Sequence, residues 1–208
     1  ITIADLIRPP RRHEKLVEHF GSARIPTRYR EFTAHAYMSL LDEDEHVAYV
    51  LGDLSQVAAP LVRVHSECLT GEVFGSQRCD CREQLDTALC YIAKQPSGAV
   101  IYLRQEGRGI GLINKLHAYR LQDQGMDTIE ANQHLGFPAD ARDYRIAARI
   151  LELLKIRSVA LLTNNLHKIE GLRAEGITVT DRIPLVVSGN PFNQDYLETK
   201  RTKMGHLL

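Results

Sequence analysis

The pattern of apolar positions along the chain predicts several β-strands in the first half of the sequence. Three runs of apolar or alternating residues have the length of strands: HVAYVLGDL at 46–54, PLVRVHSE at 60–67 and GAVIYL at 98–103. Between the second and third runs, EQLDTALCYIAK has helical periodicity and places Leu85, Leu89 and Ile92 on one face. We therefore expect two strands that meet at a turn, an amphipathic helix and a fully buried strand.

The second half of the chain alternates between helical and extended patterns. INKLHAYRLQDQ is typical of a helix, and a second unit follows as helix DYRIAARILELLKI, strand SVALLT, turn NNLHK, another helix and, after Gly176, strand ITVT. Strands that alternate with helices are typical of an α/β fold. We predict a single domain with a mixed β-sheet and flanking helices.

The two ends of the chain differ from this pattern. Residues 1–20 are basic and predicted to be helical, with a Pro-Pro pair that interrupts them, so we expect a linker with a helix on either side. We assign residues 1–23 to this linker and 24–208 to the domain. The polar tail from about Asn190 is expected to be loosely attached and flexible. Because the chain begins with Ile1 rather than Met, we expect a processed or excised fragment.

Composition and charge narrow the class of protein. The 208 residues, 44% of them hydrophobic, suffice for one large globular domain. Lys and Arg number 26 and Asp and Glu number 26, while aromatic residues make up 6% and include no Trp. A nucleic-acid-binding module normally has a basic excess and aromatic stacking residues, so that class is disfavoured. No apolar run reaches the roughly 18 residues of a membrane span and no signal peptide is recognisable, so we expect a cytoplasmic protein without membrane contact.

Three of the four cysteines, Cys68, Cys79 and Cys81, lie close together in the sequence. In a reducing compartment clustered cysteines usually bind metal or react, and a C-x-C disulfide would be badly strained. Three protein ligands with water in the fourth position form a catalytic zinc site, whereas a fourth protein ligand forms a structural one. His65 and Cys90 are candidates for that fourth ligand, although Cys90 is also typical of a small apolar residue in a helix. The spacing alone leaves both kinds of site open.

Two turns that follow predicted strands have the composition of anion-binding loops. RQEGRGIGL spaces its glycines as G-x-G-x-G, which is not the dinucleotide fingerprint, but its backbone N–H groups and its Arg104 and Arg108 suit phosphate. Glu106 in the same loop is suited to a guanine edge or to Mg²⁺. The second turn, LLTNNLHK, offers the Thr163 hydroxyl and the Lys168 ammonium. The alternatives are a glycine turn with solvated arginines and an ordinary helix cap.

Together these motifs resemble those of GTP cyclohydrolase II, the enzyme that commits GTP to riboflavin synthesis. The matching segments are RVHSECLTG, RCDC, QL at 84–85, RQEGRGIGL, KLHAYRLQDQG.DT.EAN..LGF..D.RD, LLTNN..K and the closing KMGHLL. They occur in the family's order over most of the chain, without a departure at any position to which the family assigns a role. The resemblance implies that GTP loses C8 as formate and loses diphosphate with the help of Mg²⁺. The implied product is 2,5-diamino-6-ribosylamino-4(3H)-pyrimidinone 5′-phosphate.

The resemblance also implies roles for individual residues of this chain. The implied zinc ligands are Cys68, Cys79 and Cys81. The implied GTP contacts are Arg63, Val64, His65, Ser66, Glu67, Gln84, Glu106, Gly107, Arg108, Thr128, Thr163 and Lys168. Asp140 corresponds to the proposed proton acceptor, Arg142 to the proposed nucleophile and Tyr119 to a residue near the base.

A nucleophilic role for Arg142 is chemically difficult, because removing its proton at pH 7 costs roughly 9 kcal/mol. Our alternative hypothesis is that Arg142 is a transition-state clamp and that water attacks the α-phosphate. Pairing between Asp140 and Arg142 requires a loop, which Pro138 in GFPADARD indicates. Simpler interpretations are a helix cap at Asp140 or Asp143 and helix packing for Tyr119.

The resemblance bears on partners and on rival functions too. It implies a homodimer, and the first residues look like the junction that follows a dihydroxybutanone phosphate synthase domain in bifunctional chains. One rival is a non-catalytic nucleotide- or zinc-binding module, although a degenerate copy would have lost some of Cys68, Asp140 and Arg142. Another rival is a relative that stops at the formylated product, which product analysis would distinguish.

Overall fold

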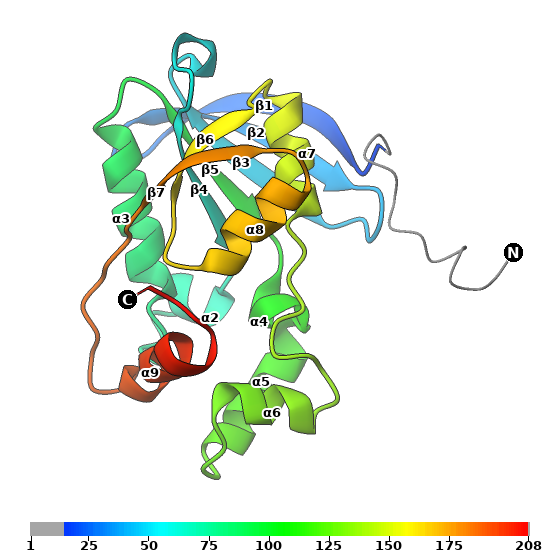
Figure 1. Ribbon diagram of the computed structural model, residues 1–208, viewed down its shortest axis with the longest axis vertical. Coiled ribbons are helices and arrows are strands. Elements are labelled where there is room, and N and C mark those ends of the chain that lie inside the picture. The colour runs from blue at the N-terminus through cyan, green and yellow to red at the C-terminus, as the bar shows by residue number, and fades with distance from the viewer. Residues whose placement is uncertain (1–14, 208) are drawn as a thin grey trace, which may run out of the picture.

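The computed structural model describes residues 15–207, which form a mixed seven-stranded sheet with helices on both faces (Figure 1). The strands are β1 (Val17–Pro26), β2 (Glu31–Ser39), β3 (Glu45–Leu51), β4 (Leu61–Ser66), β5 (Gly98–Leu103), β6 (Ser158–Leu162) and β7 (Thr178–Ile183). Their spatial order is β1-β2-β3-β5-β4-β6-β7. Pairing is antiparallel from β1 to β5 and parallel from β5 to β7. The predicted α/β fold with a mixed sheet is confirmed.

The helices are α2 (Leu69–Glu72), α3 (Cys81–Ala93), α4 (Glu106–Gly109), α5 (Gly111–Gln122), α6 (Thr128–His134), α7 (Arg145–Leu153), α8 (Leu166–Ala174) and α9 (Gln194–Lys203), with a 3-10 turn η1 (Leu54–Gln56). Consecutive residues of β5 point to opposite faces of the sheet and pack in different core clusters. Ile101 packs in the cluster that contains Ile150 and Leu172, whereas Val100 packs in the cluster that contains Ile92. Thus α7 and α8 cover one face and α3 covers the other. Within the described residues, each helix is too short or too polar to cross a membrane.

Elements with a strong local pattern were predicted correctly. The five predicted strands correspond to β3, β4, β5, β6 and β7, and the predicted helices to α3, α5, α7 and α8. The elements that were not predicted include β1, β2, α6 and α9. Strand β1 exposes most of its positions to solvent, so its sequence carries little of the alternation that marks a half-buried strand.

The helix expected over residues 1–20 is wrong where the structure describes it. Val17–Pro26 form strand β1, which pairs antiparallel with β2, with an irregularity in register between His19 and Gly21. Val17 itself is buried in the main core cluster. Pairing with the next strand outweighs the helical preference of the single segment here, and β1 runs across the boundary expected at residue 24. The Pro-Pro interruption lies outside the described residues.

The segment after Asn190 is also different from the expectation of a loosely attached tail. It contains α9, in which Lys200 is buried, and Met204 just beyond α9 is buried as well. The backbone N–H of Leu207 donates a hydrogen bond to the carbonyl of Asn164 at 2.9 Å. The segment is therefore attached to the domain through a few buried residues, while most of its polar residues are at least partly exposed.

The parallel half of the sheet positions the candidate site. Strands β4, β5 and β6 run in the same direction, so their carboxyl ends lie at one edge of the sheet. Ligands of α/β proteins bind at this edge, in loops that follow the strands. The loops after these strands contain the two predicted anion-binding turns and the first of the clustered cysteines.

Candidate active site

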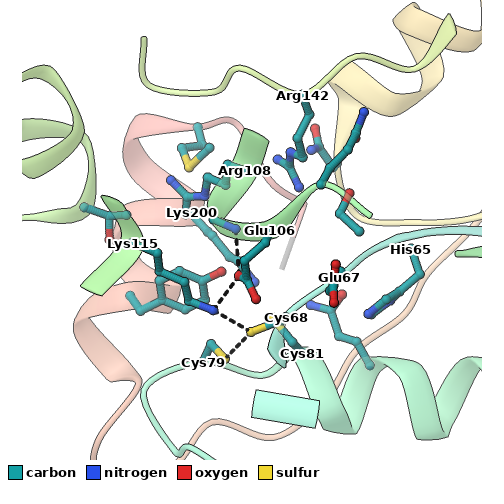
Figure 2. Close-up of a pocket in the computed structure, with 18 of the residues that line it drawn as sticks. His65, Glu67, Cys68, Cys79, Cys81, Glu106, Arg108, Lys115, Arg142 and Lys200 are labelled. Atoms are coloured by element: carbon teal, nitrogen blue, oxygen red, sulfur yellow. Dashed lines mark hydrogen bonds and ion pairs between the residues drawn. The ribbon is translucent and has the colours of Figure 1, made fainter. Parts of the chain in front are cut away.

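A pocket lies where the loops after β4, β5 and β6 meet α3, α5 and α9 (Figure 2). Most of the predicted site residues line it: Arg63, His65, Ser66, Glu67, Cys68, Cys79, Cys81, Gln84, Glu106, Gly107, Arg108, Tyr119, Thr128, Arg142, Thr163 and Lys168. Val64 and Asp140 do not. The Val64 side chain is buried in the core, and its carbonyl accepts a hydrogen bond from Lys168 Nζ at 2.8 Å. The fold thus gathers residues that lie far apart in the sequence.

The thiols of Cys68, Cys79 and Cys81 form one cluster in this pocket, with all their Sγ atoms within 4.8 Å of one another. Cys68 immediately precedes α2, and Cys81 is the first residue of α3. The Cys68 and Cys79 Sγ atoms are 3.6 Å apart. Three thiolates at this spacing are a suitable ligand set for zinc.

The expected candidates for a fourth protein ligand do not join this cluster in the described part of the chain. His65 Nε2 instead contacts Glu72 Oε1 at 2.7 Å. Cys90 lies further along α3 and is only partly buried. Since the cluster borders the pocket, water or a substrate atom can occupy the fourth position, which favours the open type of zinc site.

Hydrogen bonds among the three sulfurs move their pKa values apart. Bonds from Cys79 and Cys81 lower the pKa of Cys68, while donation to Cys68 raises the pKa of Cys79 to about 11 and that of Cys81 well above its ordinary value. Lys115 Nζ lies 3.1 Å from Cys68 Sγ and also favours its thiolate. A zinc ion would displace the remaining thiol protons, so metal binding by this cluster depends on pH.

Glu106 ties the glycine-rich loop to the cysteine cluster (Figure 2). Its Oε2 accepts from the Leu69 backbone N–H at 2.6 Å, and its Oε1 accepts from Lys115 Nζ at 2.7 Å. Lys115 was not predicted as a site residue, because a lysine on a helix normally points to solvent. Glu106 thus holds the backbone next to Cys68, and Lys115 holds the Cys68 thiolate.

The glycine-rich loop has a tightly turned backbone, and its Arg108 lines the pocket. Gly107 and Arg108 have φ values of 61° and 63°, in the left-handed region that non-glycine residues rarely adopt. At Gly109, also left-handed, a Cβ would lie 2.9 Å from the Ala141 carbonyl oxygen. Arg104 was expected to suit phosphate, but it does not line the pocket. Its Nε instead lies 3.5 Å from Glu67 Oε2.

Asp140 and Arg142 pair in a loop, as predicted for GFPADARD. Arg142 Nε donates to Asp140 Oδ1 at 2.8 Å, and Nη2 donates to Oδ2, so the contact is bidentate. Burial alone would lower the pKa of Arg142, but nearby Tyr144 and the bond to Asp140 raise it. Burial favours a raised pKa for Asp140, yet the bond from Arg142 outweighs it and lowers that pKa.

A chain of buried hydrogen bonds connects α9 with the sheet through the cysteine loop. Lys200 Nζ donates to Asp80 Oδ1 at 2.6 Å, Gln84 Nε2 donates to Asp80 Oδ2 at 2.6 Å, and Arg63 donates to Gln84 Oε1 at 2.6 Å. Arg63 also donates to the Leu162 carbonyl at 3.0 Å. Asp80 and Lys200 were not predicted as site residues, although Asp80 stands within RCDC.

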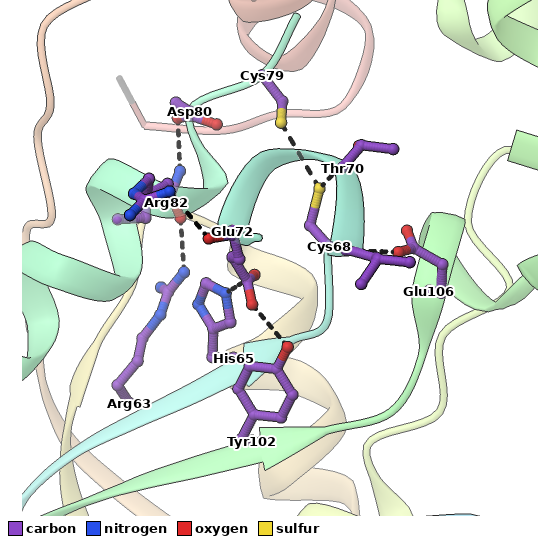
Figure 3. Close-up of polar contacts among 12 residues, drawn as sticks. Arg63, His65, Cys68, Thr70, Glu72, Cys79, Asp80, Arg82, Tyr102 and Glu106 are labelled. Carbon is purple, nitrogen blue, oxygen red and sulfur yellow. Dashed lines mark hydrogen bonds and ion pairs between the residues drawn. The ribbon is translucent and has the colours of Figure 1, made fainter. Parts of the chain in front are cut away.

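A second group of buried polar contacts holds His65 in place (Figure 3). Tyr102 donates to Glu72 Oε2 at 2.6 Å, and Glu72 Oε1 contacts His65 Nε2. The His65 and Tyr102 rings are stacked, with centroids 5.7 Å apart. Burial lowers the pKa of His65 well below its ordinary value, so the ring is neutral at pH 7, while burial raises the pKa of Glu72 to about 7.

Tyr119 and Thr128 enter the pocket from α5 and α6. The Tyr119 ring lies 4.9 Å from Arg78 Cζ and 5.7 Å from Lys115 Nζ. Burial raises the pKa of Tyr119, so its hydroxyl stays protonated near neutral pH and can donate a hydrogen bond. Thr128 is the first residue of α6, behind the cap formed by Asp127.

Comparison with known proteins agrees with this geometry. The profile of the family described as GTP cyclohydrolase II matches residues 18–184. The chain is 56% identical over 209 residues to the riboflavin biosynthesis protein RibBA of Salinispora tropica, 54% over 208 residues to that of Bacillus mycoides, and 56% over 213 residues to that of Mycobacterium avium. These matches cover 100% of this chain but 52%, 52% and 50% of the relatives, so the chain spans about half their length. The chain therefore belongs to the GTP cyclohydrolase II family of hydrolases.

Proposed function

We propose that this chain hydrolyses GTP, opens the guanine imidazole ring, and releases C8 as formate and two phosphates as diphosphate. The product is 2,5-diamino-6-ribosylamino-4(3H)-pyrimidinone 5′-phosphate, which places the reaction first in riboflavin biosynthesis. The observation that carries this proposal is the open three-thiolate cluster, which borders a pocket with buried cationic side chains. One part of such a pocket suits a metal, and the other suits a polyphosphate.

Cys68, Cys79 and Cys81 are the residues that would hold zinc. A zinc ion with three protein ligands supplies water of lowered pKa as a nucleophile at neutral pH. Glu106 and Lys115 hold the loop around Cys68 in place, through hydrogen bonds of 2.6 Å from the Leu69 N–H and 2.7 Å from Lys115 Nζ. The protonated Tyr119 hydroxyl donates a hydrogen bond to the purine ring or relays a proton during ring opening.

The triphosphate end of GTP is bound by the anion-binding loops. Arg108 presents buried Nη1 and Nη2 atoms that lack hydrogen-bond partners among the described residues. Thr163 lies on the loop after β6, and Lys168 lies on α8. Arginine forks suit phosphate oxygens, and a lysine acts as a point charge. Mg²⁺ would bind together with the phosphates, as in other phosphoryl transfers.

Arg142 acts as a clamp on the α-phosphate rather than as its nucleophile. Its bidentate contact with Asp140 and its raised pKa keep the guanidinium protonated, and the lowered pKa of Asp140 makes that carboxylate a poor proton acceptor. A water oxygen forms the new bond to phosphorus, and diphosphate leaves with the bridging oxygen. Asp140 then serves to orient Arg142.

The relatives' length supports a proposal about the whole protein. They are about twice as long as this chain, which fits fusion to a dihydroxybutanone phosphate synthase domain. We expect the protein to be cytoplasmic and homodimeric, and to act on GTP without nucleic-acid or membrane partners.

The first experiment is incubation of the chain with GTP and Mg²⁺, with formate and diphosphate quantified together, in the presence and absence of a zinc chelator. Release of both products, with formate lost on chelation, is the expected result. Diphosphate without formate would contradict ring opening and leave only the phosphoryl reaction. Release of neither product would favour a non-catalytic binding module.

A further inference from the structure

Unpartnered polar atoms gather in the part of the pocket assigned to phosphate. Nη1 and Nη2 of Arg108, Nδ2 of Asn165 and Nε2 of His206 are buried without a hydrogen-bond partner among the described residues. All three residues line the same pocket. Buried polar groups are nearly always hydrogen-bonded in proteins, so a concentration of unpaired ones indicates the place of an oxygen-rich ligand.

His206 reaches this place from the C-terminal segment. Its backbone N–H donates to the Lys200 carbonyl at 3.0 Å, and the next residue, Leu207, donates to the Asn164 carbonyl at 2.9 Å. Asn164 and Asn165 lie between β6 and α8, next to Thr163. The backbone on both sides of the His206 ring is therefore attached to the predicted second anion-binding turn and to α9.

Four basic side chains from different segments line the same pocket as His206: Lys200 of α9, Arg142, Lys168 of α8 and Arg108 of α4. Burial and these positive charges lower the pKa of His206 to about 3, so the ring is neutral. Lys200 and Arg142 have carboxylate partners in Asp80 and Asp140. Lys168 instead donates to a backbone carbonyl, and burial lowers its pKa well below the ordinary value. The Arg108 Nη atoms have no hydrogen-bond partner among the described residues, although Cζ lies 5.5 Å from the centroid of the Tyr196 ring. The positive charge in this part of the pocket is thus not fully balanced by the described protein groups.

We propose that His206 is a further substrate-binding residue, whose Nε2–H donates a hydrogen bond to a phosphate oxygen that Arg108 and Lys168 also contact. The proposal rests on the proposed function, in which GTP is the substrate. A polyphosphate would supply both the negative charge and the acceptor oxygens that this group of side chains lacks. The closing KMGHLL segment is then one wall of the substrate site.

The test uses three variants of the 208-residue chain: His206→Ala, His206→Leu, which keeps bulk without a hydrogen bond, and His206→Gln, which keeps a donor. Calorimetry gives the Kd of inorganic triphosphate and of guanosine, and steady-state assays give the KM of GTP. We expect the first two variants to bind triphosphate roughly five- to tenfold more weakly, as for one lost hydrogen bond, with guanosine affinity unchanged. His206→Gln keeps most of the affinity, and the control His117→Ala, at an exposed site on α5, keeps all of it.

Two results would overturn the proposal. One is unchanged triphosphate affinity in both His206→Ala and His206→Leu. The other is an equal loss of guanosine affinity, which would show that the ring only holds the segment in place. A wild-type chain that releases no formate from GTP would refute the proposed function instead, and selective loss of triphosphate affinity in the variants would still assign His206 to an anion site.

Discussion

At Gly71, the absence of a side chain makes room for the cysteine cluster. A Cβ at this position would lie 3.0 Å from Cys79 Sγ and 3.3 Å from Cys68 Sγ. Gly71 is buried inside α2. Any residue can adopt its helical backbone conformation, so glycine is required here only because a side chain would not fit. This residue was not among the predicted site residues, because the sequence shows a glycine without showing what it faces.

We predict that Gly71→Ala weakens zinc binding by about tenfold or more, a size typical of residues that support metal ligands. The added methyl group would push at least one sulfur out of the cluster. Zinc affinity, measured by competition with a chromogenic chelator, checks this prediction. Val73→Ala, at an exposed position just after the same helix, is the matched control. Equal zinc affinity in the Gly71→Ala and Val73→Ala variants would contradict the steric explanation.

The clamp proposed for Arg142 also makes a prediction at the residue scale. Arg142→Lys keeps the charge but loses the planar bidentate contact, so we expect diphosphate release to fall by about 10³-fold. Arg157→Lys, at an exposed site, should release diphosphate at the wild-type rate. Mass spectrometry after quenching with GTP should show no adduct on Arg142. A nucleotidyl–arginine adduct would disprove the clamp and restore the nucleophile.

At the scale of an element, α9 depends on a contact between two distant segments. The buried pair of Lys200 and Asp80 joins positions 120 residues apart, and Lys200 Nζ also lies 4.4 Å from the Tyr196 ring. Asp80 stands between two cysteines of the cluster. The pair therefore links the position of α9 to that of the cysteine loop.

We predict that Lys200→Met lowers the free energy of unfolding by about 3–5 kcal/mol, because it leaves a buried carboxylate without its cation. The double variant Lys200→Met/Asp80→Asn should recover a large part of this loss, since no unpaired charge remains. Urea unfolding of both variants and of the exposed-site control Lys155→Met measures the difference. A single variant as stable as the wild type would show that the ion pair does not anchor α9.

At the scale of the whole molecule, the cysteine cluster connects segments that the sheet alone does not hold together. Cys68 follows β4, Cys79 lies in the loop after α2, and Cys81 begins α3, which covers one face of the sheet. A bound metal would join these three points. Its removal should therefore affect global stability as well as the local site.

We predict that chelation of zinc lowers the Tm by roughly 10 °C, and that added zinc restores it, as expected for a ligand bound far above its Kd. Cys90→Ser should show the same Tm and the same zinc dependence as the wild type, because Cys90 lies outside the cluster. Thermal unfolding with one equivalent of zinc and with chelator provides the measurement. A Tm that is independent of zinc would argue against a metal at this cluster.

The sequence by itself determined the features that depend on local pattern. Period-2 and period-3.6 alternation located β3, β4, β5, α3 and α7, and strand–turn–helix order identified the α/β class. Pro138 and the short spacing of Asp140 and Arg142 indicated a loop in which the two side chains pair, and they do pair. The three cysteines were recognisable as a metal-binding set from their types and spacing. Each of these inferences needs only residue types and their spacing along the chain.

Tertiary structure alone decided the features that depend on distant partners. Strand β1 places Val17 in the same core cluster as Ile150 of α7, and α9 is attached because Lys200 meets Asp80. His65 was available as a zinc ligand in the sequence, but in the fold it contacts Glu72. Lys115 and His206 turn toward the pocket only because helices and chain end pack around it. These contacts form between segments that come together when the common core is buried. A local sequence pattern does not indicate which distant segments will meet.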